Sequence, residues 1–274
     1  MINAFLEWLG WRSALPLAPL NASEQAFLEE QVSFYAQLQS SEKLEFERRC
    51  LLFLQSVEIV GNGFEPSIED ELLVASGSVI LAWGFMRWYY VRVDQVILVA
   101  DSFNQHSEFG QDDSGIQGLV GSHHLAGRMI LSQPALHAGF SNDQDKLNVA
   151  LHEFSHLIDM SDGDVDGFPE QLSKHSFEMP WLALVQRKTE EILRGESNIR
   201  PYATVNKAEF FAVASEYFFE RPKMLKTKHP QVYRALSDFY KQDRAELRAA
   251  VKVRSKDPCL CGSGRRYKRC CMPN

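Results

Sequence analysis

Apolar residues recur along most of the chain with the period of an amphipathic helix, and in a few stretches with the character of a strand. Residues 69–83 carry an apolar run that predicts a helix buried in the core. The helical period also predicts helices near 23–38, 41–57, 180–194, 207–219 and 229–241. Ser23 stands at the start of the first of these and is a candidate N-cap.

β-Branched and aromatic residues concentrate in short stretches that predict strands at 88–93, 95–100 and 128–132. The polar, glycine-bearing residues 101–118 predict a surface loop. The aromatic residues around the first strand are expected to pack in the core; they are Trp83, Phe85, Trp88, Tyr89 and Tyr90. Helices and strands in this proportion indicate a helix-rich α+β fold.

Length and composition bound the architecture. The chain has 274 residues, of which 45% are hydrophobic, so it can build one substantial core or one domain with a small appendage. Its N-terminus lacks a basic segment and carries Glu7 within an apolar run, which makes a signal peptide a weak interpretation. The chain has no stretch of about eighteen uncharged apolar residues. We therefore expect no membrane-spanning helix and a cytoplasmic protein.

Charge divides the chain into an acidic body and a basic tail. Residues 250–274 contain seven Lys or Arg and one Asp, a net charge of +6 out of −7 overall, which leaves −13 for residues 1–249. The basic tail suggests an acidic protein surface or RNA as its partner, although it could equally fold back onto its own domain. The acidic body argues against nucleic acid as the main substrate.

The pattern HExxH occurs once, at His152, Glu153 and His156. Residues four apart lie on one helical face, so both imidazoles can reach a single metal ion, while Glu153 can reach a water on that metal. This is the arrangement that a zinc hydrolase needs. The alternative is a buried helix whose histidines only hydrogen-bond in the core. Candidate N-caps at 141–143 and a turn-rich stretch at 162–167 favour the metal interpretation.

A catalytic zinc usually takes three protein ligands and a water, so a third ligand is needed. Asp162 lies six residues after His156 and can bind zinc, but Asp159 occupies the position where such a turn favours glycine. Asp159 could instead orient the imidazole of His156. The better option is Glu209, on a predicted apolar helix with Asn206 as a plausible N-cap. A carboxylate there needs compensation, which zinc would supply, unless it borders solvent. Glu216, on the same face, is open to either interpretation.

The segments HEFSHLID and YATVNKAEFFAVASEYFF, joined by a loop rich in Asp and Gly, resemble the Mlc titration factor A family of zinc peptidases. The resemblance implies a zincin-like, gluzincin-type domain over residues 1–242 and an aminopeptidase-type activity. It implies His152, His156 and Glu209 as zinc ligands, Glu153 as general base and Tyr202 as a transition-state donor.

The family name also records titration of a transcriptional repressor of sugar metabolism. A transcriptional regulator is therefore an expected partner beside a peptide or protein substrate. The alternative function is a non-catalytic regulatory protein that keeps the peptidase fold as a scaffold for binding. The intact Glu153 favours catalysis, because a scaffold has no use for a general base beside two histidines.

The C-terminal residues carry a second pattern that is typical of a metal site. Four of the five cysteines form a CxC pair and a CC pair separated by eight residues, and they are Cys259, Cys261, Cys270 and Cys271. Thiolates this close suit a tetrahedral structural zinc, and residues 257–274 resemble the SEC-C motif. Disulfides are the weaker interpretation, because nothing indicates export. We therefore expect a linker at 243–256 before a small zinc knuckle, and Cys50 as a core thiol.

One further element could contact substrate. The strand at 128–132 precedes the HExxH helix, and zinc peptidases often bind substrate along such an edge strand. An ordinary core strand is at least as good an interpretation. His123 and His124 are expected in a surface loop rather than at a metal.

Overall fold

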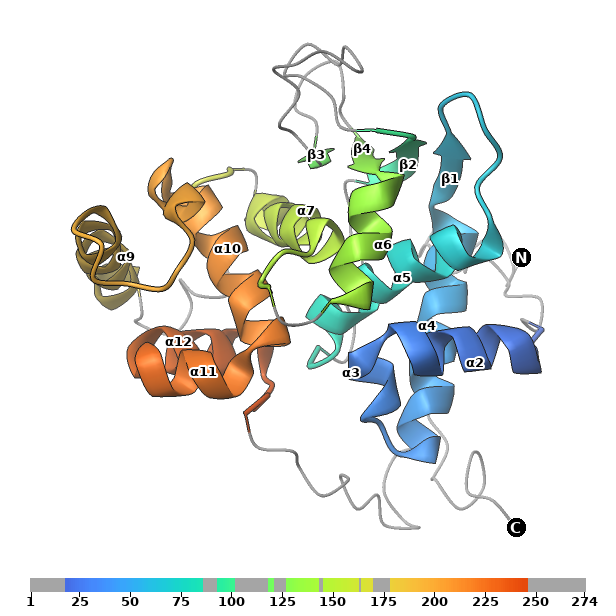
Figure 1. Ribbon diagram of the computed structural model, residues 1–274, viewed down its shortest axis with the longest axis horizontal. Helices are drawn as coiled ribbons and strands as arrows, with labels where there is room; N and C mark the ends of the chain where they lie inside the picture. Colours follow the sequence, from blue (N-terminus) through green and yellow to red (C-terminus); the bar gives the residue numbers. More distant parts are fainter. Residues whose placement is uncertain are drawn as a thin grey trace, which may run out of the picture.

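The computed structural model describes residues 18–85, 93–101, 118–120, 127–142, 145–162, 164–169 and 178–245. Within these ranges most of the chain is helical and a small sheet lies to one side (Figure 1), which confirms a helix-rich α+β architecture. The helices are α2 (Ala22–Gln31), α3 (Ser33–Ala36), α4 (Ser40–Ser56), α5 (Ile68–Ala82), α6 (Gln133–Ser141), α7 (Val149–Asp159), α9 (Glu178–Leu193), α10 (Lys207–Glu220), α11 (Pro222–Lys228) and α12 (Pro230–Tyr240), with 3₁₀ turns η2 (Met160–Asp162) and η3 (Pro201–Thr204).

The sheet has the strand order β1-β2-β4-β3, formed by β1 (Glu58–Gly61), β2 (Val93–Val99), β4 (Gly127–Ser132) and β3 (Gly118–Val120). The pairs β1–β2 and β2–β4 are parallel, whereas β3 is antiparallel to β4. β4 is therefore flanked on both sides. The expectation that residues 128–132 offer an edge to substrate is wrong, and the core-strand alternative holds, because ladder bonds to β2 and β3 already use both sides of this strand.

Two predicted helix starts need correction. The helix predicted at 23–38 breaks at Val32, whose non-helical backbone separates α2 from α3. Its N-cap is Asn21 rather than Ser23, because Asn21 and Glu24 form a reciprocal capping box. The N-cap of the HExxH helix is Asn148, not a residue at 141–143. The Asn148 side chain accepts a hydrogen bond from the Leu151 backbone N–H at 3.1 Å.

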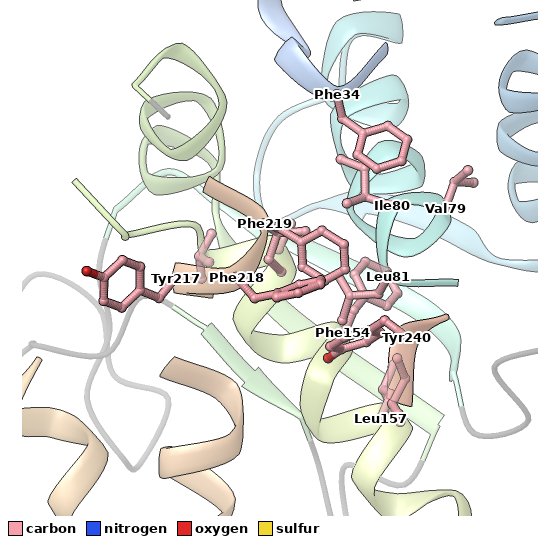
Figure 2. Close-up of a cluster of buried hydrophobic side chains, with 14 of the residues drawn as sticks. Phe34, Val79, Ile80, Leu81, Phe154, Leu157, Tyr217, Phe218, Phe219 and Tyr240 are labelled. Atoms are coloured by element: carbon pink, nitrogen blue, oxygen red, sulfur yellow. The ribbon is translucent and has the colours of Figure 1, made fainter. Parts of the chain in front are cut away.

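Helix α7 is anchored in the core by close packing against α5 and α10. A Cβ atom on Gly77 of α5 would lie 2.7 Å from the Cβ of Ala150, so glycine is what lets the two helices approach. Figure 2 shows the buried aromatic cluster shared by Phe154 of α7, Phe218 of α10 and Tyr240 of α12. This packing fixes the apolar side of α7 and leaves its histidine side facing α10.

Several predictions fall outside the described residues. They concern most of the first predicted strand with Trp88, Tyr89 and Tyr90, the loop that follows β2, His123 and His124, and the four tail cysteines. Of the predicted aromatic core, Phe85 is buried and Trp83 is half-buried, and Cys50 is a buried free thiol as expected. None of the helices in the described ranges combines the length and apolar character required to cross a bilayer.

Candidate metal centre

The two HExxH histidines lie one turn apart on α7 and point their Nε2 atoms at the same spot. The Nε2 atoms of His152 and His156 are 3.2 Å apart. Glu209 reaches this spot from α10, with its Oε2 3.0 Å from Nε2 of His152 and 3.6 Å from Nε2 of His156. One ligand atom from each residue lies within 4.8 Å of the others. The structure thus brings together the three residues that the sequence selected.

The position of Glu209 follows from the start of α10. Asn206 is the N-cap, as predicted, and its side-chain oxygen accepts a hydrogen bond from the Glu209 backbone N–H at 2.8 Å. Glu209 therefore sits in the first turn, where the positive end of the helix dipole favours a carboxylate. Apolar residues on the other faces of α10, such as Phe210 and Phe211, are fully buried and hold the helix against the core.

A second carboxylate supports the first histidine from behind. Glu216 is buried, and its Oε1 lies 2.8 Å from Nδ1 of His152. Its Oε2 accepts a hydrogen bond from the Asn148 backbone N–H at 2.8 Å, and the Arg200 guanidinium donates to Oε1. The interpretation of Glu216 as a solvent-bordering residue is wrong, because these three donors compensate its buried charge. Sequence reasoning missed Arg200, which no motif signals.

The hydrogen bonds also define the chemistry of His152. Because Glu216 accepts from Nδ1, the lone pair of neutral His152 lies on Nε2, on the side of His156 and Glu209. Two ring nitrogens and a carboxylate oxygen that converge in this way match the donor set of a zinc site, whose fourth position is left for water.

The electrostatics of the cluster favour a cation. Although burial lowers the pKa of His152, its hydrogen bonds to Glu209 and Glu216 raise that pKa to about 10. Burial raises the pKa of Glu209, but the hydrogen bonds to His152 and His156 outweigh it and hold the pKa at about 2. The carboxylates therefore stabilise positive charge where the ring nitrogens meet, which is the field that a metal ion requires.

Glu153 lies beside the cluster but is not one of the three converging residues. Its side chain is 5% exposed, and burial raises the pKa of its carboxyl group while the neighbouring histidines oppose that rise. A buried carboxylate with a raised pKa is suited to accept and return a proton.

Tyr202 stands at the open side of the site on η3. Its ring centroid is 5.9 Å from that of His152, and half of the residue is exposed. Partial burial raises the pKa of the Tyr202 phenol, with Glu209 and Glu153 adding to the rise, so the hydroxyl keeps its proton and can donate a hydrogen bond.

The local alternatives behave differently from Glu209. Asp159 is fully buried and accepts a hydrogen bond from the Gly167 backbone N–H at 2.8 Å, which ties down the loop after the helix. Burial raises the pKa of Asp159 to about 6. No hydrogen bond joins it to His156, whose buried Nδ1 has no partner among the described residues. The side chain of Asp162 lies outside the described residues.

Known protein families match both the body of the chain and its tail. The glucose-regulated metallo-peptidase M90 family matches residues 7–241, and the SEC-C motif matches residues 256–273. An uncharacterized protein of Synechocystis sp. is 31% identical over 251 residues, which cover 87% of this chain and 91% of that protein. Mlc titration factor A of Yersinia enterocolitica is 27% identical over 85% of both chains. The protein of that name from Salmonella paratyphi B is 33% identical over 71% of this chain and 77% of its own.

Proposed function

Because the chain belongs to the glucose-regulated metallo-peptidase M90 family, we propose that it is a zinc-dependent peptidase of the aminopeptidase type. The observation that carries the proposal is the convergence of ligand atoms from His152, His156 and Glu209 within 4.8 Å of one another. In this proposal residues 1–242 form a zincin-like domain, and these three residues hold a catalytic zinc ion.

Glu153 is the proposed general base. A bound zinc ion supplies Lewis acidity, which makes a water molecule easier to deprotonate and a peptide carbonyl easier to attack. Glu153 takes the proton from the attacking water and later passes it to the leaving amine. Its raised pKa supports this double role, because a more basic carboxylate accepts the proton more readily.

Tyr202 is the proposed donor to the developing oxyanion. Its hydroxyl keeps its proton near neutral pH, and its ring lies beside His152 at the exposed side of the site. A hydrogen bond that forms mainly in the transition state accelerates the chemical step without tightening substrate binding.

The tail is proposed to hold a second, structural zinc. Its proposed ligands are Cys259, Cys261, Cys270 and Cys271, and the support is the SEC-C match over residues 256–273. Four thiolates saturate a tetrahedral zinc and leave no place for water, so this ion would stabilise the knuckle without catalysing a reaction. Residues 243–256 would then act as the linker, and a reducing compartment such as the cytoplasm would keep the thiols available.

A second candidate function is binding of a transcriptional regulator, favoured by the relatives named Mlc titration factor A. The peptidase fold would serve as the binding scaffold, with or without turnover. The basic tail would in addition attract an acidic protein surface or RNA.

The first test compares full-length wild type with Glu153→Gln in zinc content and in hydrolysis of aminoacyl p-nitroanilides. The variant should keep its zinc and lose turnover by about 10²–10⁴-fold. Glu190→Gln, which alters an exposed glutamate on α9, is the matched control and should behave as wild type. Equal turnover in Glu153→Gln would refute the mechanism. A zinc-loaded wild type without turnover would favour the scaffold function.

The two zinc sites can be counted separately. Elemental analysis of full-length protein should give two zinc ions per chain, and replacement of both Cys270 and Cys271 by Ser should leave one. A count that stays at two in this variant would refute the tail site. A count of one that falls to none would refute zinc at the HExxH site.

A further inference from the structure

A cavity of about 750 Å³ lies beside the start of α7. Residues of α3, α6 and the junction between α10 and α11 also line it. Its wall includes Asn148 and Leu151 at the start of α7 but none of the three converging residues of the metal centre. Its volume is within the range of small-molecule sites. The cavity is therefore a separate compartment that adjoins the helix of the metal centre.

The charged residues around this cavity are mostly basic. Four cationic side chains and one carboxylate, Glu220, belong to its wall; the cations are Arg221, Lys223, Lys228 and Arg244. This excess of positive charge contrasts with the net charge of −7 for the whole chain. A concave surface with one dominant sign of charge concentrates ligands of the opposite sign.

Arg244 is the member of this set that points most clearly to a ligand. Its guanidinium carbon lies 4.1 Å from the centroid of the Phe34 ring, and its buried Nε has no hydrogen-bond partner among the described residues. Burial lowers the pKa of Arg244 to about 10. Within the described part of the chain, its only charge-related contacts are the Phe34 ring and Tyr233. A largely desolvated cation normally has an anionic partner, and no carboxylate among the described residues pairs with Arg244, so Arg244 can pair with an anion that enters the cavity.

The remainder of the cavity is apolar. Phe34, Ile80 and Phe219, drawn in Figure 2, come from three different helices and contribute to its wall, as do Phe140 of α6 and Leu151 of α7. An inorganic ion would leave this surface in contact with water. A ligand that carries an apolar body behind its charged group would cover it and gain from the burial.

We propose that this cavity binds a small organic anion, in which a carboxylate or phosphate group pairs with Arg244 and an apolar body packs against Phe34 and Phe219. The planar guanidinium can donate to either anionic group through two parallel hydrogen bonds. The proposal does not depend on peptidase activity.

Three probes with the same apolar body separate the contribution of the charged group from that of the apolar body. They are octanoate, octyl phosphate and 1-octanol. Each is titrated by calorimetry into zinc-loaded, full-length wild type and into Arg244→Gln. At least one anion should bind saturably, and the octanoate-to-octyl-phosphate ratio identifies the preferred charged group. Arg244→Gln should weaken that binding at least about tenfold, as expected for the loss of a charged hydrogen bond. Octanol should bind at least about tenfold more weakly than the better anion.

Two further variants complete the test: one is a control, and the other tests the cavity if Arg244→Gln does not fold. Arg194→Gln alters an exposed arginine near the end of α9 and should bind as wild type. Lys228→Glu places a negative charge at the exposed rim of the cavity and should weaken anion binding at least about twofold even if Arg244→Gln fails to fold. Absence of anion binding, equal binding of octanol, or unchanged affinity in the folded Arg244 or Lys228 variant would overturn the proposal. The last outcome would place the anion elsewhere, for example at the metal.

Discussion

Replacement of Glu216 by Gln tests whether the buried carboxylate behind His152 tunes the proposed metal centre. Glu216 accepts hydrogen bonds from His152, Asn148 and Arg200. A glutamine has the same shape but only one side-chain oxygen, and its NH₂ group is a donor. In whichever orientation it takes, a donor faces at least one of the three former donors. With the NH₂ group toward His152, the imidazole loses the acceptor that fixes its Nδ1–H tautomer. With the amide oxygen toward His152, it keeps only a neutral acceptor, which holds the Nδ1–H more weakly than a carboxylate does, and the NH₂ group faces the Asn148 backbone N–H instead.

The size of the effect follows from these contacts. Loss of an outer partner of a ligating histidine typically costs 10–100-fold in metal affinity, or about 1.4–2.8 kcal/mol. Removing the charge also leaves the Arg200 guanidinium beside a neutral amide. Arg200 retains 23% of its side-chain exposure, so water limits that cost to less than the roughly 3–5 kcal/mol of a fully buried broken pair. We therefore expect weaker zinc binding together with a smaller loss of folding stability.

The assay is competition for zinc between full-length protein and a chromophoric chelator, with urea unfolding of the metal-free protein measured in parallel. Glu216→Gln should raise the zinc Kd at least tenfold. Glu196→Gln, at an exposed glutamate after α9, is the matched control and should leave it unchanged. A zinc Kd within twofold of wild type in Glu216→Gln would show that the histidine is held by its packing alone, and would refute the reasoning.

Three further predictions concern single residues. Tyr202→Phe should lower turnover by about 10²–10³-fold with unchanged zinc content, and unchanged turnover would remove Tyr202 from the mechanism. Burial, together with the nearby Lys188, lowers the pKa of His229 from 6.5 to about 4, so in that window the unfolded chain binds a proton that the folded chain does not. Between pH 6.5 and pH 4, the unfolding free energy of wild type should therefore fall by up to about 3 kcal/mol more than that of His229→Gln. Urea titrations at both pH values measure this difference. An equal fall in the unfolding free energy of the two proteins would contradict the prediction. Gly77→Ala should lower the free energy of unfolding by about 1–2 kcal/mol, because the added Cβ would collide with α7. This loss should outweigh the better helix propensity of alanine. A higher free energy of unfolding in urea would show that α5 and α7 can move apart without cost.

The features that depend on local patterns could be predicted from the sequence. The periodicity gave α5, α10 and α12 nearly to their ends, and the cap at Asn206 required only an Asn followed by an apolar helix. His152 and His156 needed only the helical repeat to share a face. Each of these predictions concerns residues within a few turns of one another, where backbone geometry alone decides the outcome.

The features that depend on tertiary contacts could not be predicted in this way. Asn142 and Asn148 are both reasonable N-caps locally, yet Asn142 ends α6 and Asn148 begins α7. The environment of Glu216 is set by Arg200, which precedes it by 16 residues and carries no motif. Whether β4 lies at an edge depends on the pairing of β3, which has only three residues in the ladder. In each case the deciding partner lies on another element.

The proposed metal centre lies where two helices cross, and loops contribute little to it. Glu209 and Glu216 are seven residues apart on α10, about two turns, so both carboxylates face α7 on one stripe. A slide of α10 along α7 would displace both the proposed ligand Glu209 and the carboxylate of Glu216 that holds His152. The crossing is held by fully buried aromatic residues such as Phe154 and Phe218. Core substitutions at this crossing should therefore weaken zinc binding before they unfold the protein, whereas equally destabilising substitutions in β1, remote from the crossing, should not.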